Sequence, residues 1–167
     1  MSKIYLISEN ILKSETILND NVGSEYIAPA IETSQDIYLQ QLIGTELLDK
    51  LYELVEDGSI SGDYKELLDD YITNYLKYKV LSEIVIPLAY KYRNAGLVQV
   101  TGDKMSWSPL KDATIIQNHY ELRATFYAER MTKYLSANAS KFPEYRSTRT
   151  SADIMADTDS YKTNWVL

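Results

Sequence analysis

The chain has 167 residues, of which 45% are hydrophobic and 25% charged, and its net charge is −7 at pH 7. A chain of this size and balance is expected to fold as one domain without a disulfide or a metal to hold it together. It contains no Cys and one His, which excludes thiolate zinc sites, iron–sulfur clusters and Cys nucleophiles. We therefore expect a protein that is not an enzyme, with no catalytic residue, no metal and no cofactor.

The charge is unevenly distributed along the sequence. Residues 46–70 hold nine acidic and two basic side chains, whereas residues 71–140 carry a dispersed net charge of +4. Burying several like charges together is costly, so we expect the acidic stretch on a solvent-exposed or channel-lining face. We call this the acidic face, and its predicted members are Glu53, Glu56, Asp57, Asp63 and Asp70.

The acidic composition and the pattern of apolar residues also restrict the partners. An acidic chain is poorly suited to bind nucleic acid through its phosphates. No apolar run approaches the roughly 20 residues that span a bilayer, and the N-terminus lacks the pattern of a signal peptide. We expect a soluble protein with no membrane partner, which stays in the compartment where it is made.

Tyrosine is the unusual component, with 15 Tyr against 2 Phe and 2 Trp. A tyrosine buries an apolar ring but its hydroxyl needs a partner or water. The composition fits either a core whose aromatic residues reach the surface or an extensive protein contact surface, in which Tyr is enriched.

The first half of the chain shows helical periodicity. Residues 4–7 are a short apolar run that fits either a strand or the buried start of a helix. The spacing of apolar residues predicts a helix over 24–43, stopped by Gly44, and a second helix over 46–56, which ends before Asp57-Gly58. Because Pro is tolerated in a first helical turn, a regular start of the first helix at Ala28 or Pro29 is the alternative. The close succession of the two helices makes them neighbours.

A third, longer helical stretch is predicted from residue 61 to residue 89. From Val80 to Ala89 it is apolar nearly all round, which is typical of the central helix of a core. Pro87 lies inside it, so a kink or break is expected there. Glu83 is expected to be exposed or paired with a basic side chain such as Arg123, with a functional role as the lesser alternative.

Residues 97–108 change to a period of two. If Gly102-Asp103 forms a tight turn, Val98 faces Trp107 and Val100 faces Met105. Those four side chains then share one apolar face. The pattern predicts a half-buried β-hairpin over about 97–107, which needs helices or another chain to support it.

The last helix is predicted over about 110–138. One apolar stripe runs from Ile116 to Leu135, and a second contains Ile115, His119, Leu122 and Phe126, while Glu121 is expected on the opposite, polar side. So wide an apolar face suggests packing against two helices at once. We expect His119 to be a packed, hydrogen-bonded residue at the edge of the core rather than a ligand.

Periodicity is lost after Asn138, and residues 141–167 are rich in Ser, Thr and Asp. We expect an extended C-terminal arm that lies along a partner or a neighbouring copy. The apolar face of the hairpin and the aromatic and aliphatic residues of the arm are the predicted interface: Val98, Val100, Met105, Trp107, Tyr145, Tyr161, Trp165, Val166 and Leu167.

The fold class predicted from these patterns is mainly α, a helical bundle of about four to five helices with one β-hairpin (about 97–107) and an extended C-terminal tail. The predicted organisation is a helical domain over 1–140 and an arm over 141–167. The chain has no Gly-rich phosphate loop, no metal-ligand spacing and no nucleophile elbow.

Several short stretches, in order, resemble one protein family. They are Ile27-Ala28-Pro29-Ala30-Ile31, Gln35-Asp36, Leu39-Gln40, Leu42-Ile43-Gly44, Leu47, Leu67-Leu68, Tyr71-Ile72, Asn94-Ala95-Gly96-Leu97-Val98, Tyr134-Leu135, Asn138, Phe142-Pro143 and Tyr145. Together they resemble the head-tail connector, or neck adaptor, proteins of tailed phages, most closely those of crAss-like and other Bacteroides phages. Each stretch alone is a turn or a core position, so the resemblance rests on their order and spacing over residues 4–145.

The resemblance implies a structural virion protein of the neck. Such a subunit assembles with itself into a ring under the portal protein, with twelve copies to match a portal, and contacts other neck or tail proteins. The ring extends the channel through which DNA passes and joins head to tail. The implied location is the virion, with the host cytoplasm during assembly.

Two other classes remain open from the residues alone. One is a helical regulator outside the virion that binds a host or phage protein through its acidic helix. The other is an accessory domain whose partner carries the chemistry.

Overall fold

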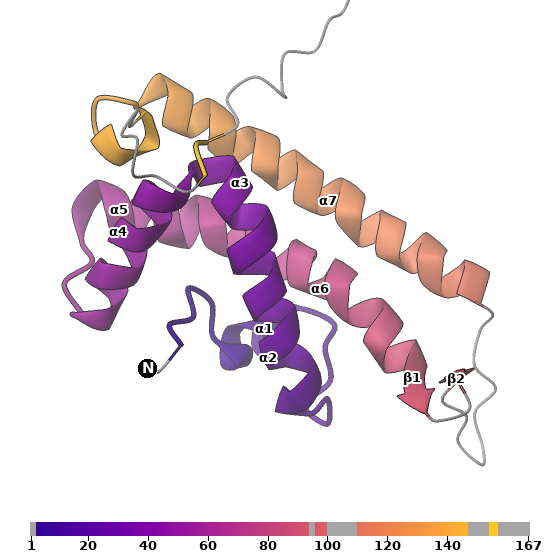
Figure 1. Ribbon diagram of the computed structural model, residues 1–167. Coiled ribbons are helices and arrows are strands. Elements are labelled where there is room, and N and C mark those ends of the chain that lie inside the picture. The colour runs from indigo at the N-terminus through magenta and orange to yellow at the C-terminus, as the bar shows by residue number, and fades with distance from the viewer. Residues whose placement is uncertain (1–2, 94–95, 100–109, 147–153, 157–167) are drawn as a thin grey trace, which may run out of the picture.

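The computed structural model describes residues 3–93, 96–99, 110–146 and 154–156. The fold is mainly helical, as predicted (Figure 1). The π-helical turns η1 and η2 continue the helices beside them, so residues 24–43 and 62–89 form two unbroken helical runs. In chain order the elements are α1 (Glu9–Glu15), α2 (Ser24–Thr33), η1 (Ser34–Leu39), α3 (Gln40–Ile43), α4 (Thr45–Glu56), α5 (Gly62–Glu66), η2 (Leu67–Ile72), α6 (Thr73–Ala89), β1 (Tyr90–Arg93), β2 (Gly96–Gln99), α7 (Leu110–Ala137) and the 3₁₀ turn η3 (Pro143–Arg146).

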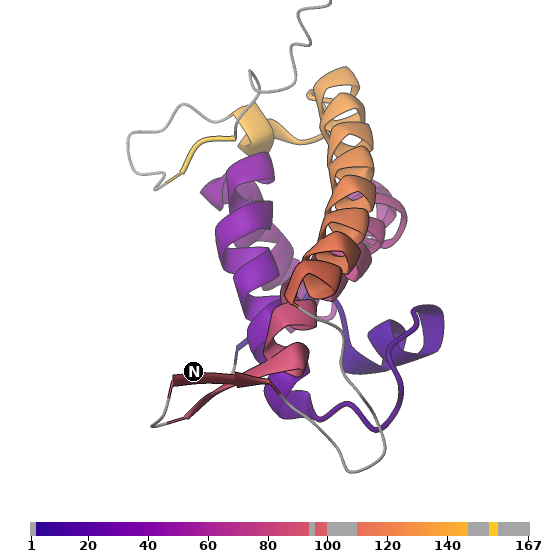
Figure 2. The same ribbon diagram turned by 90° about the vertical axis from the view of Figure 1, so that its right-hand side faces the viewer.

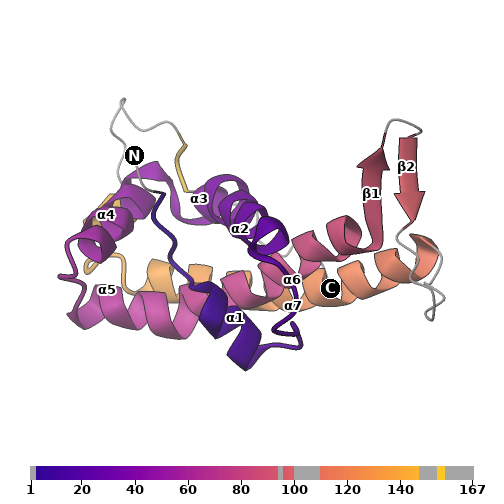
Figure 3. The same ribbon diagram turned by 90° about the horizontal axis from the view of Figure 1, so that it is seen from below.

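The two longest helices, α6 and α7, lie against each other in antiparallel directions (Figures 1 and 3). Ala124 and Ala128 of α7 are buried in this contact, and their small side chains let the helices approach closely. On α6, Leu76 and Val80 are completely buried. The apolar stretch from Val80 onward is thus enclosed by other elements, as its lack of a polar face predicts.

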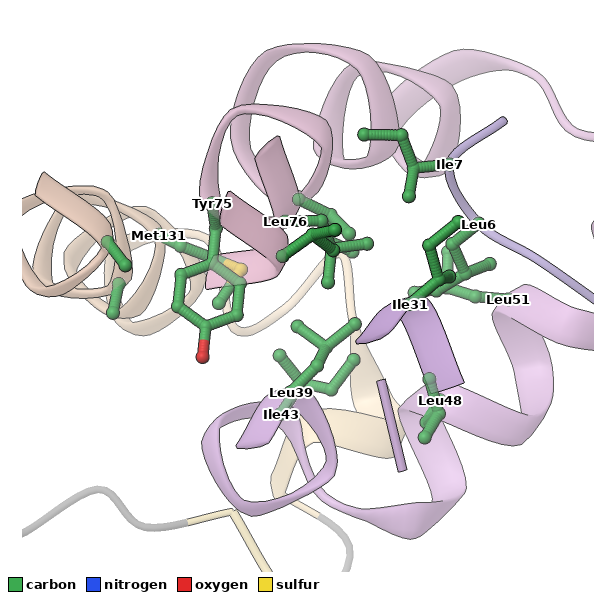
Figure 4. Close-up of a cluster of buried hydrophobic side chains, with 14 of the residues drawn as sticks. Leu6, Ile7, Ile31, Leu39, Ile43, Leu48, Leu51, Tyr75, Leu76 and Met131 are labelled. Carbon is green, nitrogen blue, oxygen red and sulfur yellow. The ribbon is translucent and has the colours of Figure 1, made fainter. Parts of the chain in front are cut away.

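The core gathers side chains from segments that are far apart in the sequence. Figure 4 shows Leu6 and Ile7 of the N-terminal segment close to Ile31 of α2 and Leu51 of α4. Tyr75 of α6 lies near Met131 of α7 in the same view. The apolar run at residues 4–7 is neither a strand nor a helix, yet Leu6 and Ile7 are buried, whereas Ile4 is half-buried and Tyr5 is exposed.

A buried glutamine explains how that irregular segment is held. The side chain of Gln35, 2% exposed, accepts a hydrogen bond from the Leu6 amide at 2.7 Å and donates to the Ile4 carbonyl at 3.2 Å. Its amide nitrogen also contacts the Tyr52 hydroxyl at 3.1 Å. A side-chain amide can replace a neighbouring strand in this way, because it offers both a donor and acceptors.

The β-hairpin predicted over residues 97–107 is not seen. β2 instead pairs with β1 in antiparallel register, so that Val98 is opposite Lys91 and Gln99 is opposite Tyr90. The alternation of apolar residues indicates that a segment is a strand, but it does not say which neighbour it pairs with. Residues 100–109, which include Val100, Met105 and Trp107, lie outside the described part of the chain.

The β1–β2 pair stands out from the helices at the end of α6 (Figures 2 and 3). The helix continues through Pro87 and ends at Ala89, so the break comes two residues later than the proline. Tyr90 is already extended, with φ of −136° and ψ of 143°.

The predicted boundary at residue 140 is wrong, because residues 141–146 pack on the helices of their own subunit. Phe142 is completely buried and Tyr145 is 3% exposed. The Phe142 ring lies edge-on to Tyr64, with 5.3 Å between the ring centroids. Lys141 forms an ion pair with Asp63 of α5 at 2.6 Å.

Residues 154–156 also return to the same subunit. The Thr45 amide donates to the Ile154 carbonyl at 2.9 Å, and the Ile154 amide donates to the Thr45 hydroxyl at the same distance. Gly44, at φ of +80°, lies beneath this contact, and a Cβ there would come within 3.0 Å of the Ala156 nitrogen. These described stretches of the predicted arm therefore contact their own domain.

Candidate interaction surfaces

The acidic face lies on α4, α5 and η2, with α4 and α5 at one end of the bundle (Figure 3). Glu53, Glu56, Asp57 and Asp70 are exposed, and Asp63 is half-buried. Their exposure agrees with the predicted solvent-facing position.

Part of this charge is neutralised within the subunit. Glu53 pairs with Lys50 at 2.8 Å, and Asp63 pairs with Lys141 at 2.6 Å. Within the described part of the chain, Glu56, Asp57 and Asp70 form no ion pair. These three carboxylates are the uncompensated centre of the acidic face.

The position of the carboxylates on α4 does not favour the stability of that helix. Glu53 and Glu56 are in its last turns and Asp57 caps its C-terminal end. The helix dipole is negative at this end, so each exposed carboxylate there is unfavourable by about 0.3–1 kcal/mol at low salt. Local stability therefore does not explain why acidic residues are concentrated at this point.

A second polar cluster surrounds Lys79, a lysine that is only 4% exposed. Its Nζ lies 2.8 Å from both carboxylate oxygens of Glu121 on α7 and 3.4 Å from Glu83 Oε1. It also lies 3.5 Å from the ring centroid of Tyr38. Ser82 donates a hydrogen bond to Glu121 at 2.9 Å. Burial raises the pKa of the Tyr38 hydroxyl, and the charge of Lys79 opposes that rise.

The Lys79 cluster is arranged to join helices. It links η1, α6 and α7 through one cation and two carboxylates. Among the described residues there is no group of three His, Asp or Glu side chains that could hold a metal ion. The Lys79 cation lies between the Glu83 and Glu121 carboxylates and compensates their charge.

The sequence did not indicate this cluster correctly. The sequence predicts Glu121 on the polar side of the last helix, and Glu83 either exposed or paired with a basic side chain such as Arg123. Glu83 is paired with a basic side chain, but that side chain is Lys79, and Glu121 reaches the same lysine from α7. The guanidinium of Arg123 lies instead 5.6 Å from the ring centroid of Tyr78. The available signal was Lys79 itself, a charged residue inside an otherwise buried turn, which needs a partner.

The second apolar stripe of α7 is exposed, contrary to the expectation that it packs on another helix. We call Ile115, His119, Leu122 and Phe126 the α7 stripe. Ile115 is 59%, Leu122 73% and Phe126 62% exposed. His119 is exposed as well, with its ring edge-on to Tyr120, and so is not the packed residue that the sequence predicts.

A hollow runs along this stripe between α6 and α7. Tyr78, Arg123 and Tyr127 line it together with three residues of the stripe. The rings of Tyr78 and Tyr127 are stacked, with 5.3 Å between centroids, and are part of its lining. The arrangement offers an aromatic and aliphatic surface flanked by a cation.

Comparison with known proteins identifies a family. A model of that family matches residues 39–154, which is more than half of the chain. The chain belongs to the DUF6712 family. That family is described as one of unknown function. No curated protein and no solved structure matches the chain.

The DUF6712 match begins at the last residue of η1 and ends at Ile154, so it includes the acidic face, Lys79, the α7 stripe and the pair between Thr45 and Ile154. None of the helices in the described ranges of the DUF6712 chain is both long and apolar enough to cross a membrane.

The predicted interface of the DUF6712 chain is placed only in part. Val98 lies in β2. Tyr145 is wrong as an interface residue, because its side chain is buried in the core of its own subunit. Tyr161, Trp165, Val166 and Leu167 lie outside the described residues, as do the three hairpin residues named above. The exposed α7 stripe was not predicted as an interface at all.

Proposed function

We propose that this protein is a structural subunit of the neck of a tailed phage. In this proposal, copies of the chain form a ring under the portal protein, extend the DNA channel and join head to tail. The proposal includes twelve copies, contacts with the portal and with other neck or tail proteins, and DNA as a passing polymer. The location is the virion, reached through the host cytoplasm during assembly.

The observation that carries the proposal is the uncompensated acidic face. Glu56, Asp57 and Asp70 are exposed and have no ion-pair partner among the described residues. Glu56 and Asp57 also lie at the C-terminal end of α4, where that helix gains no stability from them. DNA carries one negative charge for about every 1.7 Å of duplex. A wall with the same sign of charge repels the phosphates, so DNA can slide past it without binding.

The resemblance of the sequence to head-tail connector proteins supports the same function. The mainly helical bundle fits the subunit that the resemblance implies. The Lys79 cluster also fits, because it compensates charge inside the bundle rather than presenting groups to a substrate.

The test is an inventory of purified particles of the phage that encodes the chain. Mass spectrometry is expected to find the protein in virions at about the copy number of the portal protein. Deleting its gene is expected to give filled heads without tails. If the protein is absent from virions although it is made during infection, the neck assignment is overturned in favour of a regulator that acts outside the particle.

The acidic face has its own test. Changing Glu56, Asp57 and Asp70 to Lys is expected to leave the fold intact and to make the protein bind duplex DNA in a salt-sensitive way. The matched control changes the same residues to Gln or Asn, which removes the charge without reversing it. A charge-reversed variant that complements the deletion as well as the wild type would contradict a channel-lining role.

A further inference from the structure

The α7 stripe is an apolar surface that the described part of its own subunit leaves open. The buried side of α7, which includes Tyr120, Ala124 and Met131, faces the rest of the bundle. In an α-helix of 3.6 residues per turn, Ile115, His119, Leu122 and Phe126 follow one line along a different side. The described part of the subunit leaves Ile115, Leu122 and Phe126 largely exposed, although Tyr78 of α6 lines the hollow beside them.

The residues of the stripe are arranged symmetrically about one point. The point lies between residues 120 and 121. Ile115 and Phe126 are equally far from it on the two sides, and so are His119 and Leu122. If a second copy of α7 lies antiparallel across that point, Ile115 faces the partner's Phe126 and His119 faces the partner's Leu122.

Charges beside the stripe are arranged about nearly the same point, since the midpoint of Lys111 and Glu129 is residue 120 and that of Asp112 and Arg130 is residue 121. Lys111 and Glu129 are 18 residues apart, as are Asp112 and Arg130. Eighteen residues make about five full turns of an α-helix, so each pair lies along one side of α7. In the antiparallel arrangement Lys111 meets the partner's Glu129, and Asp112 meets the partner's Arg130. In a parallel arrangement each of these side chains would lie beside the same residue of the partner, so like charges would meet.

We propose that two copies of this chain associate through the α7 stripe, with their α7 helices antiparallel about a two-fold axis between residues 120 and 121. The contact covers Ile115, Leu122 and Phe126 with apolar groups, and opposite charges set its direction. Charged residues that flank an apolar helical seam select partner and orientation in this way.

This inference does not rest on the proposed function. A two-fold contact uses the same surface on both subunits and joins only two copies, whereas a ring needs a head-to-tail contact between different surfaces. A dimer without a ring, or a ring without this dimer, would separate the two proposals.

The first test measures association of the full chain by analytical ultracentrifugation over a range of concentrations. As its concentration rises, the wild type is expected to change from monomer to dimer, and this surface is expected to form no larger oligomer. Lys111→Glu is expected to weaken the dimer about tenfold, because the two-fold axis places two repulsive pairs in each contact. Combining it with Glu129→Lys is expected to restore the affinity to within about twofold. The control is Lys65→Glu on α5, away from the stripe, which should change nothing.

The second test fixes the direction. The chain has no Cys, so an introduced cysteine is the only thiol. Ile115→Cys and Phe126→Cys proteins are expected to form a mixed disulfide with each other when oxidised together. Neither is expected to crosslink with itself, because the two equivalent positions are offset by about 16 Å along the helices, whereas a disulfide needs Cα atoms within about 7 Å.

Three outcomes would overturn the proposal. The chain could stay monomeric at millimolar concentration. Ile115→Cys could crosslink with itself as fast as with Phe126→Cys, which indicates a parallel pair. Lys111→Glu and its combination with Glu129→Lys could associate equally well, which shows that the flanking charges do not meet.

Discussion

Replacing Lys79 with Met tests whether the buried ion cluster holds α6 to α7. Met has nearly the length of the lysine stem and carries no charge, so the change removes the cation with little change in packing volume. Glu121 loses the group that lies 2.8 Å from both of its oxygens, and Glu83 loses its partner at 3.4 Å. Two carboxylates then lie near one another without a cation between them.

The magnitude follows from the exposure of the three side chains. Removing one partner of a fully buried ion pair costs about 3–5 kcal/mol. Lys79 is 4% exposed, but the Glu121 side chain is 44% exposed and water screens its charge. We therefore expect Lys79→Met to lower the free energy of unfolding by about 2 kcal/mol. For a chain of this size the loss corresponds to a melting temperature lower by about 4–8 °C.

The assay is urea unfolding followed by circular dichroism, with the slope of the transition checked for change. Lys77→Met on the same helix is the control, because Lys77 pairs with an exposed Glu15 and such pairs contribute below about 1 kcal/mol. Lys79→Met combined with Glu121→Met should recover most of the loss, since the carboxylate facing Lys79 is removed as well. If the free energy of unfolding of Lys79→Met is within about 0.5 kcal/mol of the wild-type value, the cluster does not contribute to the stability of the bundle.

Three further predictions concern other parts of the subunit. Gly44→Ala should cost about 1–3 kcal/mol in urea unfolding, because φ is +80° and the new Cβ meets the Ala156 nitrogen at 3.0 Å. Gly58 also has a positive φ, +63°, but open space around it, so Gly58→Ala should cost about 1–2 kcal/mol from backbone strain alone. A chain ending at residue 153 should be less stable by about 1–2 kcal/mol than one ending at residue 156, because it lacks the hydrogen bonds with Thr45; equal melting of the two would contradict packing of this segment on its own subunit. Burial raises the pKa of Tyr52 to about 12, so the folded state keeps the hydroxyl proton while the unfolded chain loses it above pH 10. The free energy of unfolding should therefore fall between pH 10 and pH 12. In thermal melts over this pH range, Tyr52→Phe should make that fall less steep.

The main helices could be predicted because their signals are local. The spacing of Ile27, Ile31 and Leu42, with Gly44 after them, is contained within one stretch of chain. The structure places the ends of these helices close to the predicted positions. The same holds for the exposed carboxylates, since like charges at high local density avoid burial wherever the rest of the chain lies.

The errors concern which segments meet. The period of two at Leu97 and Val98 indicated a strand correctly, but β1 was not recognised as its partner. The apolar width of α7 indicated a face at Leu122 and Phe126, but not whether anything in the same subunit covers it. Glu121 lies next to the buried Tyr120 at the edge of the helix contact, where its long side chain can reach Lys79. The periodicity of apolar residues does not predict such a contact.

The pair between Thr45 and Ile154 has a consequence for how the subunit is made. The two residues are separated by 109 positions, and ribosomes add about 5–20 residues per second. The start of α4 is therefore synthesised roughly 5–20 s before the segment that completes its hydrogen bonds. During this interval the nascent chain already holds α4, α5 and α6 but lacks the contact that covers Gly44. The hydrogen bonds at the start of α4 therefore form only after residue 154 has been translated.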